Sequence, residues 1–267
     1  MRPRSGGFTL AEMAIVLVVV GLLLTSVLST VSTQIEARNI GETQSRLNQV
    51  KDALIGFAQA NGRLPCAADG TLVTGAATAG QEPAMVANAC PIAAKYAVLP
   101  WAALGVAETD VWGRRFTYVV DVNFADLYAA NSWSAGCGAG PVPVPGTPTS
   151  FALCSTGTLT VKTRTSANKA GTSVSGVPVV IISHGKNGYG AYTPGGTQYT
   201  APPAVNADET ANTPAAASTT FYSREQSPQT STCSDTAAGN FCEYDDLVAY
   251  IPVSLLVTRM VSAGKLP

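Results

Sequence analysis

The sequence predicts an α+β fold in which a long N-terminal helix packs on a small antiparallel β-sheet, with disulfide-tied loops and a short C-terminal helix. Three observations lead to this fold class. An apolar run fills residues 8–31, a stripe of apolar residues at helical spacing follows it, and short β-prone segments occupy much of the remaining chain of 267 residues. Only 12% of the residues are charged and no basic patch occurs, so nothing indicates a nucleic-acid partner.

The apolar run is long enough to cross a membrane once. Its only ionisable residue is Glu12. About 20 such residues, at about 1.5 Å each, span a hydrocarbon core of roughly 30 Å. Arg2 and Arg4 precede the run and no further basic residue occurs before Arg38. The excess of positive charge therefore predicts a cytoplasmic N-terminus and a translocated remainder.

Two common kinds of segment share this hydropathy. A secretory signal peptide also has a basic start and an apolar core, and "VLSTVSTQIEA" is a loose match to a small-residue cleavage site. A simple membrane anchor fits equally well. Neither explains Glu12, because a carboxylate in an apolar helix costs a few kcal/mol unless it has a partner. Neither explains the two glycines, Gly6 and Gly7, directly before Phe8.

Residues 7–13, Gly-Phe-Thr-Leu-Ala-Glu-Met, resemble the processing site of type IV pilins and type II secretion pseudopilins. The resemblance implies that a prepilin peptidase removes the leader 1–7 by cutting after Gly7 and then N-methylates the new amine of Phe8. It also implies that the carboxylate of Glu12 meets the N-terminal amine of a neighbouring subunit. The two opposite charges would neutralise one another and set the register of assembly.

The resemblance further implies a structural role rather than an enzymatic one. The expected partners are other pilin or pseudopilin subunits, the prepilin peptidase and an inner-membrane assembly platform. The precursor is expected in the inner membrane with a periplasmic head, and the mature chain in a pilus or pseudopilus, in the periplasm or at the cell surface. The long insertions favour a minor subunit at or near the tip, with a major subunit as the alternative. An anchored or secreted hydrolase with a pilin-like leader is the alternative of another class.

Residues 32–62 are expected to form the amphipathic half of the long helix. Gly62 stands where a helix cap is needed and Pro65 prevents continuation. Gly41 is expected to be a weak point within the helix, because glycine costs about 1 kcal/mol relative to alanine there. The apolar stripe consists of Ile40, Leu47, Val50, Leu54 and Phe57.

The globular head, residues 63–267, is predicted to contain about four antiparallel strands in one sheet. The candidate strands are residues 116–122, 158–165, 177–185 and 247–251. The segment "DVWGRRFTY" resembles the turn and first strand of major pseudopilin heads and predicts a buried Trp112. The polar segment 193–242 is expected to be a flexible surface loop.

A C-terminal helix is predicted from apolar residues at helical spacing, which are Val253, Leu256, Val257, Met260 and Val261. Pro252 suits its start and Gly264 its end. Major pseudopilins usually end in a calcium-bearing loop without such a helix, so this segment departs from their pattern.

The six cysteines form an even set without a C-x-x-C motif, which argues against zinc-ribbon and thioredoxin-type sites. Consecutive cysteines bracket loops rich in glycine or proline. The economical pairing is therefore Cys66 with Cys90, Cys137 with Cys154, and Cys233 with Cys242. This prediction holds for an oxidising compartment, and free buried thiols are the alternative.

Calcium is the one cofactor to consider, because the resemblance to major pseudopilins implies a calcium loop near the last strands. Asp245 and Asp246 supply hard oxygen ligands, together with backbone carbonyls of residues 184–188. Lys186 and Asn187 stand where acidic ligands are wanted, so capping of a turn by Asp245 is the alternative. His184 is the only histidine and lies in no nucleophile motif, so no catalytic site is predicted.

Overall fold

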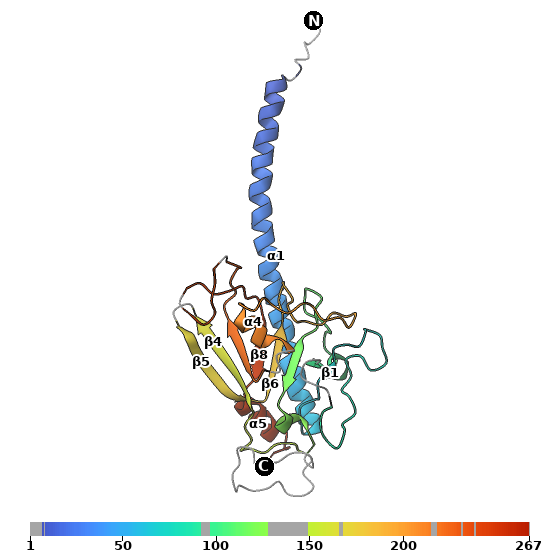
Figure 1. Ribbon diagram of the computed structural model, residues 1–267. Helices are drawn as coiled ribbons and strands as arrows, with labels where there is room; N and C mark the ends of the chain where they lie inside the picture. Colours follow the sequence, from blue (N-terminus) through green and yellow to red (C-terminus); the bar gives the residue numbers. More distant parts are fainter. Residues whose placement is uncertain are drawn as a thin grey trace. The chain divides into compact units, whose positions relative to one another are not determined.

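The computed structural model describes residues 7, 9–91, 97–127, 149–165, 168–214, 218–230, 232–237 and 239–266, and the side chains of residues 23–30 lie outside the described part. The chain divides into two compact units, Met1–Glu42 and Thr43–Pro267. We call them the N-terminal unit and the C-terminal unit. The helix α1 (Leu10–Asn61), 52 residues long, contributes to both (Figure 1).

The end of α1 follows the sequence signals. Gly62 has a φ of 75° and its N–H donates to the carbonyl of Ala58 over 2.7 Å. A positive φ is accessible to glycine without steric cost, which explains a helix stop at this residue. The helix passes through Gly41 without interruption.

The first sheet has five strands in the order β1-β2-β3-β6-β8, and all neighbours are antiparallel. Its strand β6 (Val179–Ser183) lies between β3 (Thr117–Val120) and β8 (Leu247–Ile251) and is buried along its whole length. The continuous β-branched run of β6 fits this central position, because a strand covered on both faces needs apolar side chains on both. The short β1 (Ala68–Asp69) and β2 (Ala97–Val98) complete one edge.

A second sheet corrects the prediction of a single one. Its order is β5-β4-β7, formed by β4 (Leu159–Thr165), β5 (Asn168–Val177) and β7 (Thr220–Arg224). Strands β4 and β5 lie side by side and run antiparallel (Figure 1). Strands β4 and β7 are parallel. Val161 of β4 packs in a cluster with Val180 and Ile182 of β6, so the second sheet covers one face of the first.

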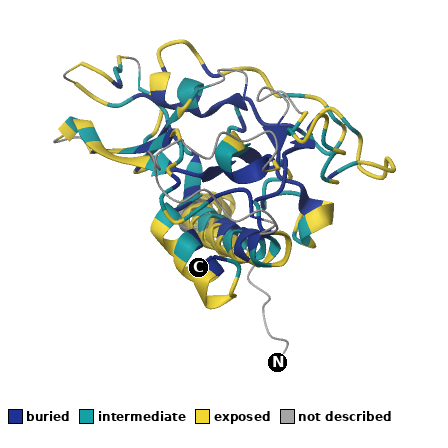
Figure 2. Ribbon diagram, turned by 90° about the horizontal axis from the view of Figure 1, so that it is seen from below, coloured by how far each residue is buried: buried dark blue, intermediate teal, exposed yellow. Residues whose placement is uncertain are grey.

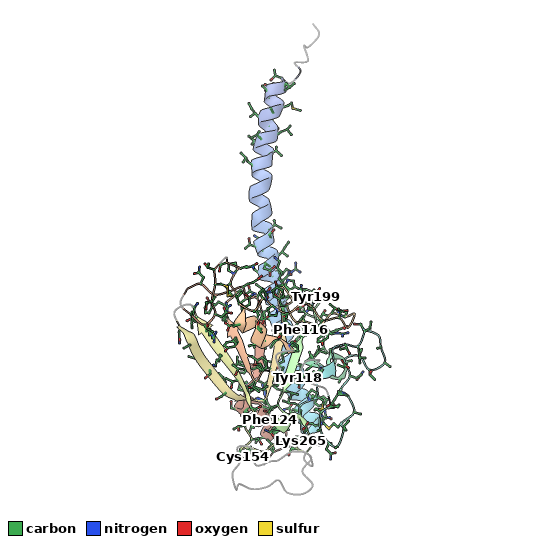
Figure 3. All side chains as sticks on the ribbon, in the orientation of Figure 1. Phe116, Tyr118, Phe124, Cys154, Tyr199 and Lys265 are labelled. Carbon is green, nitrogen blue, oxygen red and sulfur yellow. A yellow bond between two sulfur atoms is a disulfide. The ribbon has the colours of Figure 1, made fainter. Side chains whose placement is uncertain are left out.

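The opposite face of the first sheet is covered by helices of the C-terminal unit. Leu47, Val50 and Leu54 of α1 are at most 1% exposed and belong to one apolar cluster with residues of β3, β6, β8 and α5 (Val253–Ser262). Figure 2 shows the buried residues gathered inside this unit. Figure 3 labels Phe116 and Tyr118, which belong to the same cluster.

The apolar faces of both helices differ in detail from the predicted ones. Ala58 of α1 is fully buried, whereas Phe57 is half-buried with the guanidinium of Arg63 over its ring at 5.5 Å. In α5, Leu256 and Met260 are buried but Val261 is 43% exposed. Trp112, predicted to be buried, is half-buried in the turn that Asp110 caps.

The segment 193–242 was predicted to be a flexible loop, and this prediction is wrong for much of it. It contains α4 (Ala207–Asn212) and the strand β7, which contact one another. Apolar residues are scarce here, and buried ion pairs take their place, since Arg224 of β7 contacts Asp208 of α4. The part of the C-terminal unit that the structure describes also contains two single-turn helices, α2 (Trp101–Leu104) and α3 (Val122–Ala125).

Two of the predicted disulfides are present. Cys66 pairs with Cys90, with Cα atoms 5.4 Å apart, and Cys233 pairs with Cys242, with Cα atoms 4.8 Å apart. Cys137 lies outside the described residues, so its predicted bond with Cys154 stays a prediction.

Candidate functional site

The first site predicted from the sequence lies at the start of α1. Gly7 is exposed, and Phe8 lies outside the described residues. The apolar side chains that follow are open to their surroundings, with Leu10 90% and Leu17 72% exposed. Among the described residues, no helix combines the length and the apolar character that a membrane crossing requires.

Glu12 closes a capping box with Thr9. The backbone N–H and the hydroxyl of Thr9 both donate to Glu12 Oε2 over 2.8 Å, and the N–H of Glu12 donates back to Thr9 Oγ1 over 3.3 Å. Such a box satisfies N–H groups that have no partner within the first turn of a helix. In the single chain, Glu12 therefore already has a local role in starting α1.

The second site is a cluster of three carboxylates in the C-terminal unit. Glu209 belongs to α4, and Asp245 and Asp246 directly precede β8. One ligand atom of each lies within 4.8 Å of the others. Glu209 is 1% and Asp246 4% exposed, and Asp245 is half-buried. Three acidic groups therefore share one largely buried volume.

Amide groups orient these carboxylates. The side chain of Asn187 donates to Glu209 Oε1 over 2.9 Å, and its backbone N–H donates to Asp245 Oδ2 over 2.7 Å. The side chain of Asn212 donates to Asp246 Oδ2 over 2.8 Å. The capping of a turn by Asp245, the alternative to a metal role, is thus present.

Burial raises the pKa of two of the three groups. The pKa of Glu209 is raised from 4.5 to about 7, mainly by burial and then by the charge of Asp246. The pKa of Asp245 is raised from 3.8 to about 7, again mainly by burial and further by Asp246 and Glu209. Hydrogen bonds from Asn187 oppose both shifts. With pKa values of about 7, Glu209 and Asp245 are therefore partly protonated near neutral pH.

Three of the five backbone carbonyls predicted as calcium ligands already accept hydrogen bonds. The two Nη atoms of Arg114 donate to the carbonyls of Gly185 and Lys186 over 3.0 and 2.7 Å. The carbonyl of His184 accepts from the N–H of Gly188 over 2.8 Å. The calcium role of Asp245 and Asp246 stays a prediction, and Glu209 is the third carboxylate of their cluster.

His184 lies beside this cluster in a line of buried polar groups. Its Nε2 is 2.7 Å from Thr117 Oγ1, and its Nδ1 is 3.5 Å from Asp246 Oδ1. The arrangement has the order of a nucleophile, a histidine and a carboxylate. However, Thr117 is 1% exposed and His184 fully buried, so a substrate has no access to the hydroxyl in this conformation. Ser183 turns away and donates to Asp110 over 2.7 Å.

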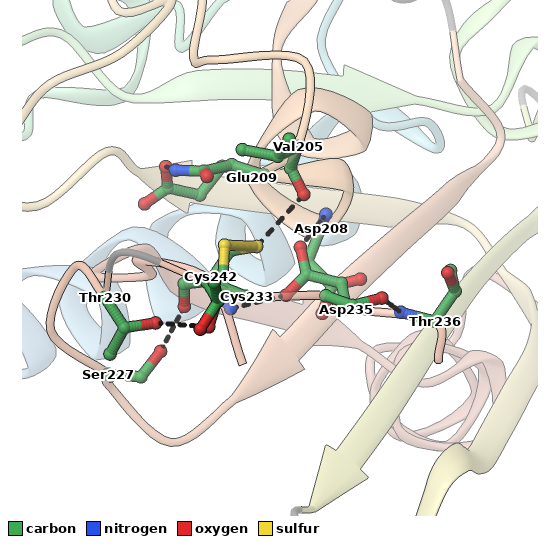
Figure 4. The surroundings of a disulfide bond; sticks show 12 residues. Val205, Asp208, Glu209, Ser227, Thr230, Cys233, Asp235, Thr236 and Cys242 are labelled. Atoms are coloured by element: carbon green, nitrogen blue, oxygen red, sulfur yellow. Dashed lines mark hydrogen bonds between the residues drawn. A yellow bond between two sulfur atoms is a disulfide. The ribbon is translucent and has the colours of Figure 1, made fainter. Parts of the chain in front are cut away.

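A buried ion network links the carboxylate cluster to a disulfide. Arg224 contacts Asp208 over 2.9 Å and Asp235 over 3.2 Å, and Arg164 contacts Asp208 over 2.7 Å. Asp235 Oδ1 also accepts the N–H of Cys242 over 3.1 Å. Figure 4 shows the Cys233–Cys242 bond with Asp208, Glu209 and Asp235 around it.

Glu209 and Asp208 were not predicted as site residues from the sequence. They lie inside the polar segment 193–242, where no periodic pattern indicated a helix. One signal was present: "ADET" is the only place in residues 193–224 with two adjacent acidic residues. Adjacent carboxylates on one short helix point in different directions, so two distinct partners were to be expected.

Comparison with known proteins identifies the motif to which the first site, at the start of α1, belongs. Residues 2–28 match the family model described as the prokaryotic N-terminal methylation motif. The chain therefore carries the prepilin signal of type IV pilins and pseudopilins, which implies processing by a prepilin peptidase and assembly with other subunits of this kind. No curated protein and no solved structure matches the chain.

Proposed function

We propose that this protein is a structural subunit of a type IV pilus or of a type II secretion pseudopilus. In this proposal, a prepilin peptidase cuts between Gly7 and Phe8 and N-methylates the amine of Phe8. The mature chain then joins other pilin-type subunits. The match of residues 2–28 to the methylation motif is the observation that carries the proposal.

The geometry at the start of α1 supports a role for Glu12 in assembly. Both bonds from Thr9 end on Oε2, so Oε1 is the oxygen at which the amine of a neighbouring Phe8 would donate. In apolar surroundings, this pairing would neutralise two charges that are each costly alone. The exposed apolar side chains of residues 10–22 would then pack against those of neighbouring subunits.

Before assembly, we place residues 8–31 across the inner membrane as a single span, with Arg2 and Arg4 on the cytoplasmic side. An inner-membrane assembly platform would draw the processed subunit out of the lipid. The C-terminal unit would then lie in the periplasm or at the cell surface.

A minor subunit at or near the tip is our first choice. The elements α4, β7 and α5 add to a helix-and-sheet core, and a tip position has the most room for them. The alternative is a major subunit, which would repeat these elements along the whole fibre.

A hydrolase with a pilin-like leader is the alternative from another class. The observation behind this alternative is that His184 contacts both Thr117 and Asp246, in the order of a nucleophile, a histidine and a carboxylate. The burial of all three residues favours a structural role instead. A hydrolase would lose its activity in His184→Ala while processing of the leader continues, whereas a filament subunit would still assemble if its fold tolerates the change.

The deciding experiment is the intact mass and N-terminal residue of the protein purified from its native membranes. A chain that begins at Phe8 and is heavier by one methyl group is the expected result. A chain that begins near Gln34 would mean a conventional signal peptide, and the filament proposal would be abandoned.

A further inference from the structure

The two cysteines of the Cys233–Cys242 disulfide differ in their access to solvent. Cys242 is fully buried, whereas Cys233 is half-buried. Cys233 also lines a surface cavity of about 340 Å³, and the other residues that line it are Thr232, Ser234, Gly239 and Asn240. A thiolate in solution would therefore reach this disulfide from the side of Cys233.

The buried sulfur has a hydrogen-bond acceptor in place for a thiol. Cys242 Sγ lies 3.2 Å from the carbonyl oxygen of Val205 (Figure 4). In the disulfide this sulfur carries no hydrogen, but the thiol of a reduced Cys242 would donate its S–H to that oxygen. A buried donor costs less free energy when it has an acceptor, so the fold accommodates the reduced form.

Hydrogen bonds hold the disulfide loop together independently of the covalent bond. Asp235 Oδ1 accepts the N–H of Cys242 over 3.1 Å, and the N–H of Ser234 donates to the carbonyl of Asn240 over 2.9 Å. From outside the loop, Lys169 Nζ donates to the carbonyl of Ser234 over 2.6 Å. The two thiols of the reduced chain would therefore stay close together and be able to form the disulfide again.

We propose that Cys233–Cys242 is a site of reversible thiol–disulfide exchange with a dithiol partner. A thiolate of the partner bonds to Cys233 Sγ, the bond between Cys233 and Cys242 breaks, and its electron pair leaves with Cys242. Cys242 takes a proton from water and donates it in a hydrogen bond to Val205. The second thiolate of the partner then attacks the partner's own sulfur in the mixed disulfide and releases Cys233 as a thiolate. This chain thereby gains two electrons, and the dithiol is oxidised to a disulfide.

The other described disulfide is the natural comparison. Cys66 and Cys90 are 24 positions apart in the chain, whereas Cys233 and Cys242 are 9 positions apart. Because a disulfide that closes a shorter loop restricts the unfolded chain less, its reduction removes less of the free energy of unfolding. The fold should therefore tolerate reduction of Cys233–Cys242 better. This role goes beyond the proposed subunit function and does not depend on it.

The test is partial reduction of the oxidised full-length protein in detergent micelles, with dithiothreitol as the dithiol. Samples are quenched in acid, alkylated and digested with trypsin, which yields the peptides 64–95 and 225–259 with one of the two cysteine pairs each. The alkylated fraction of each peptide gives the two reduction rates. The pair Cys233 and Cys242 should be reduced at least fivefold faster, because a cavity gives access to it. Near-ultraviolet circular dichroism should change little at that stage.

Two single variants test which sulfur is attacked. Cys242→Ser leaves the sulfur of Cys233 as a free thiol, and Cys233→Ser leaves that of Cys242. Both variants open the same loop, so they are matched controls for one another. With an aromatic disulfide reagent, the thiol of Cys242→Ser should react at least tenfold faster, because Cys242 is fully buried.

Three results would overturn the proposal. If Cys66–Cys90 is reduced as fast as Cys233–Cys242 or faster, the cavity gives no preferred access. If the two single variants react equally fast, attack is not directed to Cys233. If the wild-type protein loses its near-ultraviolet signal as soon as Cys233–Cys242 is reduced, this disulfide is a structural tie and not a site of reversible exchange.

Discussion

The two carboxylate sites of this protein are built in opposite ways. Glu12 is held by Thr9, a residue three positions earlier, in an exposed first turn. Glu209 meets Asp245 across 36 positions, and it is almost fully buried. The site at Glu12 forms as soon as the first turn of α1 forms, whereas the site at Glu209 forms only when the C-terminal unit is folded. A local motif predicts the first kind of site, and only the packing of distant segments creates the second.

Glu12→Ala should give the largest effect and concerns assembly alone. Because Glu12 lies outside the C-terminal unit, the fold of that unit should be unchanged while filaments disappear. The measurement is the amount of pelletable filament in cells, with circular dichroism of the purified protein as a check of folding. Asp52→Ala, which removes an exposed carboxylate from the same helix, is the control and should assemble normally. Normal filaments from Glu12→Ala would refute the role of this residue.

Arg224→Ala should destabilise the C-terminal unit by about 3–5 kcal/mol, because it leaves the buried Asp235 without its cation and Asp208 with Arg164 alone. Arg224 contacts both Asp208 and Asp235, and its side chain is 1% exposed. Urea unfolding measures the change. Arg259→Ala, at an exposed position of α5, should change the free energy of unfolding by less than about 0.5 kcal/mol. Equal effects of the two variants would mean that the buried ion network contributes little.

Leu54→Ala and Leu17→Ala compare the two ends of α1. Leu54 is fully buried in the apolar cluster, and its truncation should cost about 2–5 kcal/mol. Leu17 is 72% exposed in the single chain, so its truncation should leave urea unfolding of the C-terminal unit unchanged. If Leu54→Ala were equally silent, the cluster between α1 and the first sheet would not be the core.

The stability of the C-terminal unit should fall as the pH rises when no divalent cation is present. The folded-state pKa values of Glu209 and Asp245 are raised to about 7 from 4.5 and 3.8, so the folded chain retains protons that the unfolded chain has released. Asp208, with its pKa raised to about 6, adds an effect of the same sign. The free energy of unfolding therefore decreases between about pH 4 and pH 7.

Urea unfolding at pH 5 and at pH 8 in the presence of a chelator checks this slope. The double variant Glu209→Gln with Asp245→Asn should show a smaller slope than the wild-type protein. A wild-type protein that is more stable at pH 8 than at pH 5 would contradict the assigned shifts.

Thr9→Ala should give the smallest effect, because it removes only the capping box. Loss of an N-cap costs about 0.5–2 kcal/mol, and the loss is confined to the first turn of α1. Faster amide hydrogen exchange in that turn, measured in micelles, is the expected result. Thr9→Ser should restore slow exchange, since serine offers the same hydroxyl. Unchanged exchange in Thr9→Ala would mean that the box does not hold the turn.

Much of the framework was predictable from short-range patterns. The helical spacing of Leu47, Val50 and Leu54, the cap at Gly62 and the β-branched run of β6 all appear in the structure as predicted. Each depends on the conformational preference or burial of residues that are close in the sequence. Val261 and Trp112 were misjudged, because their exposure depends on which other segment covers them.

The sequence by itself determined the long N-terminal helix, its methylation motif and the position of Glu12, because helix periodicity, caps and processing signals are local. Only the tertiary structure decided that β4 joins a second sheet, that β7 runs parallel to it, and that Glu209 meets Asp245 and Asp246. Parallel pairing and clusters of buried charge join residues far apart in the chain, and their stability comes from the surrounding packing. No short stretch of sequence contains that information.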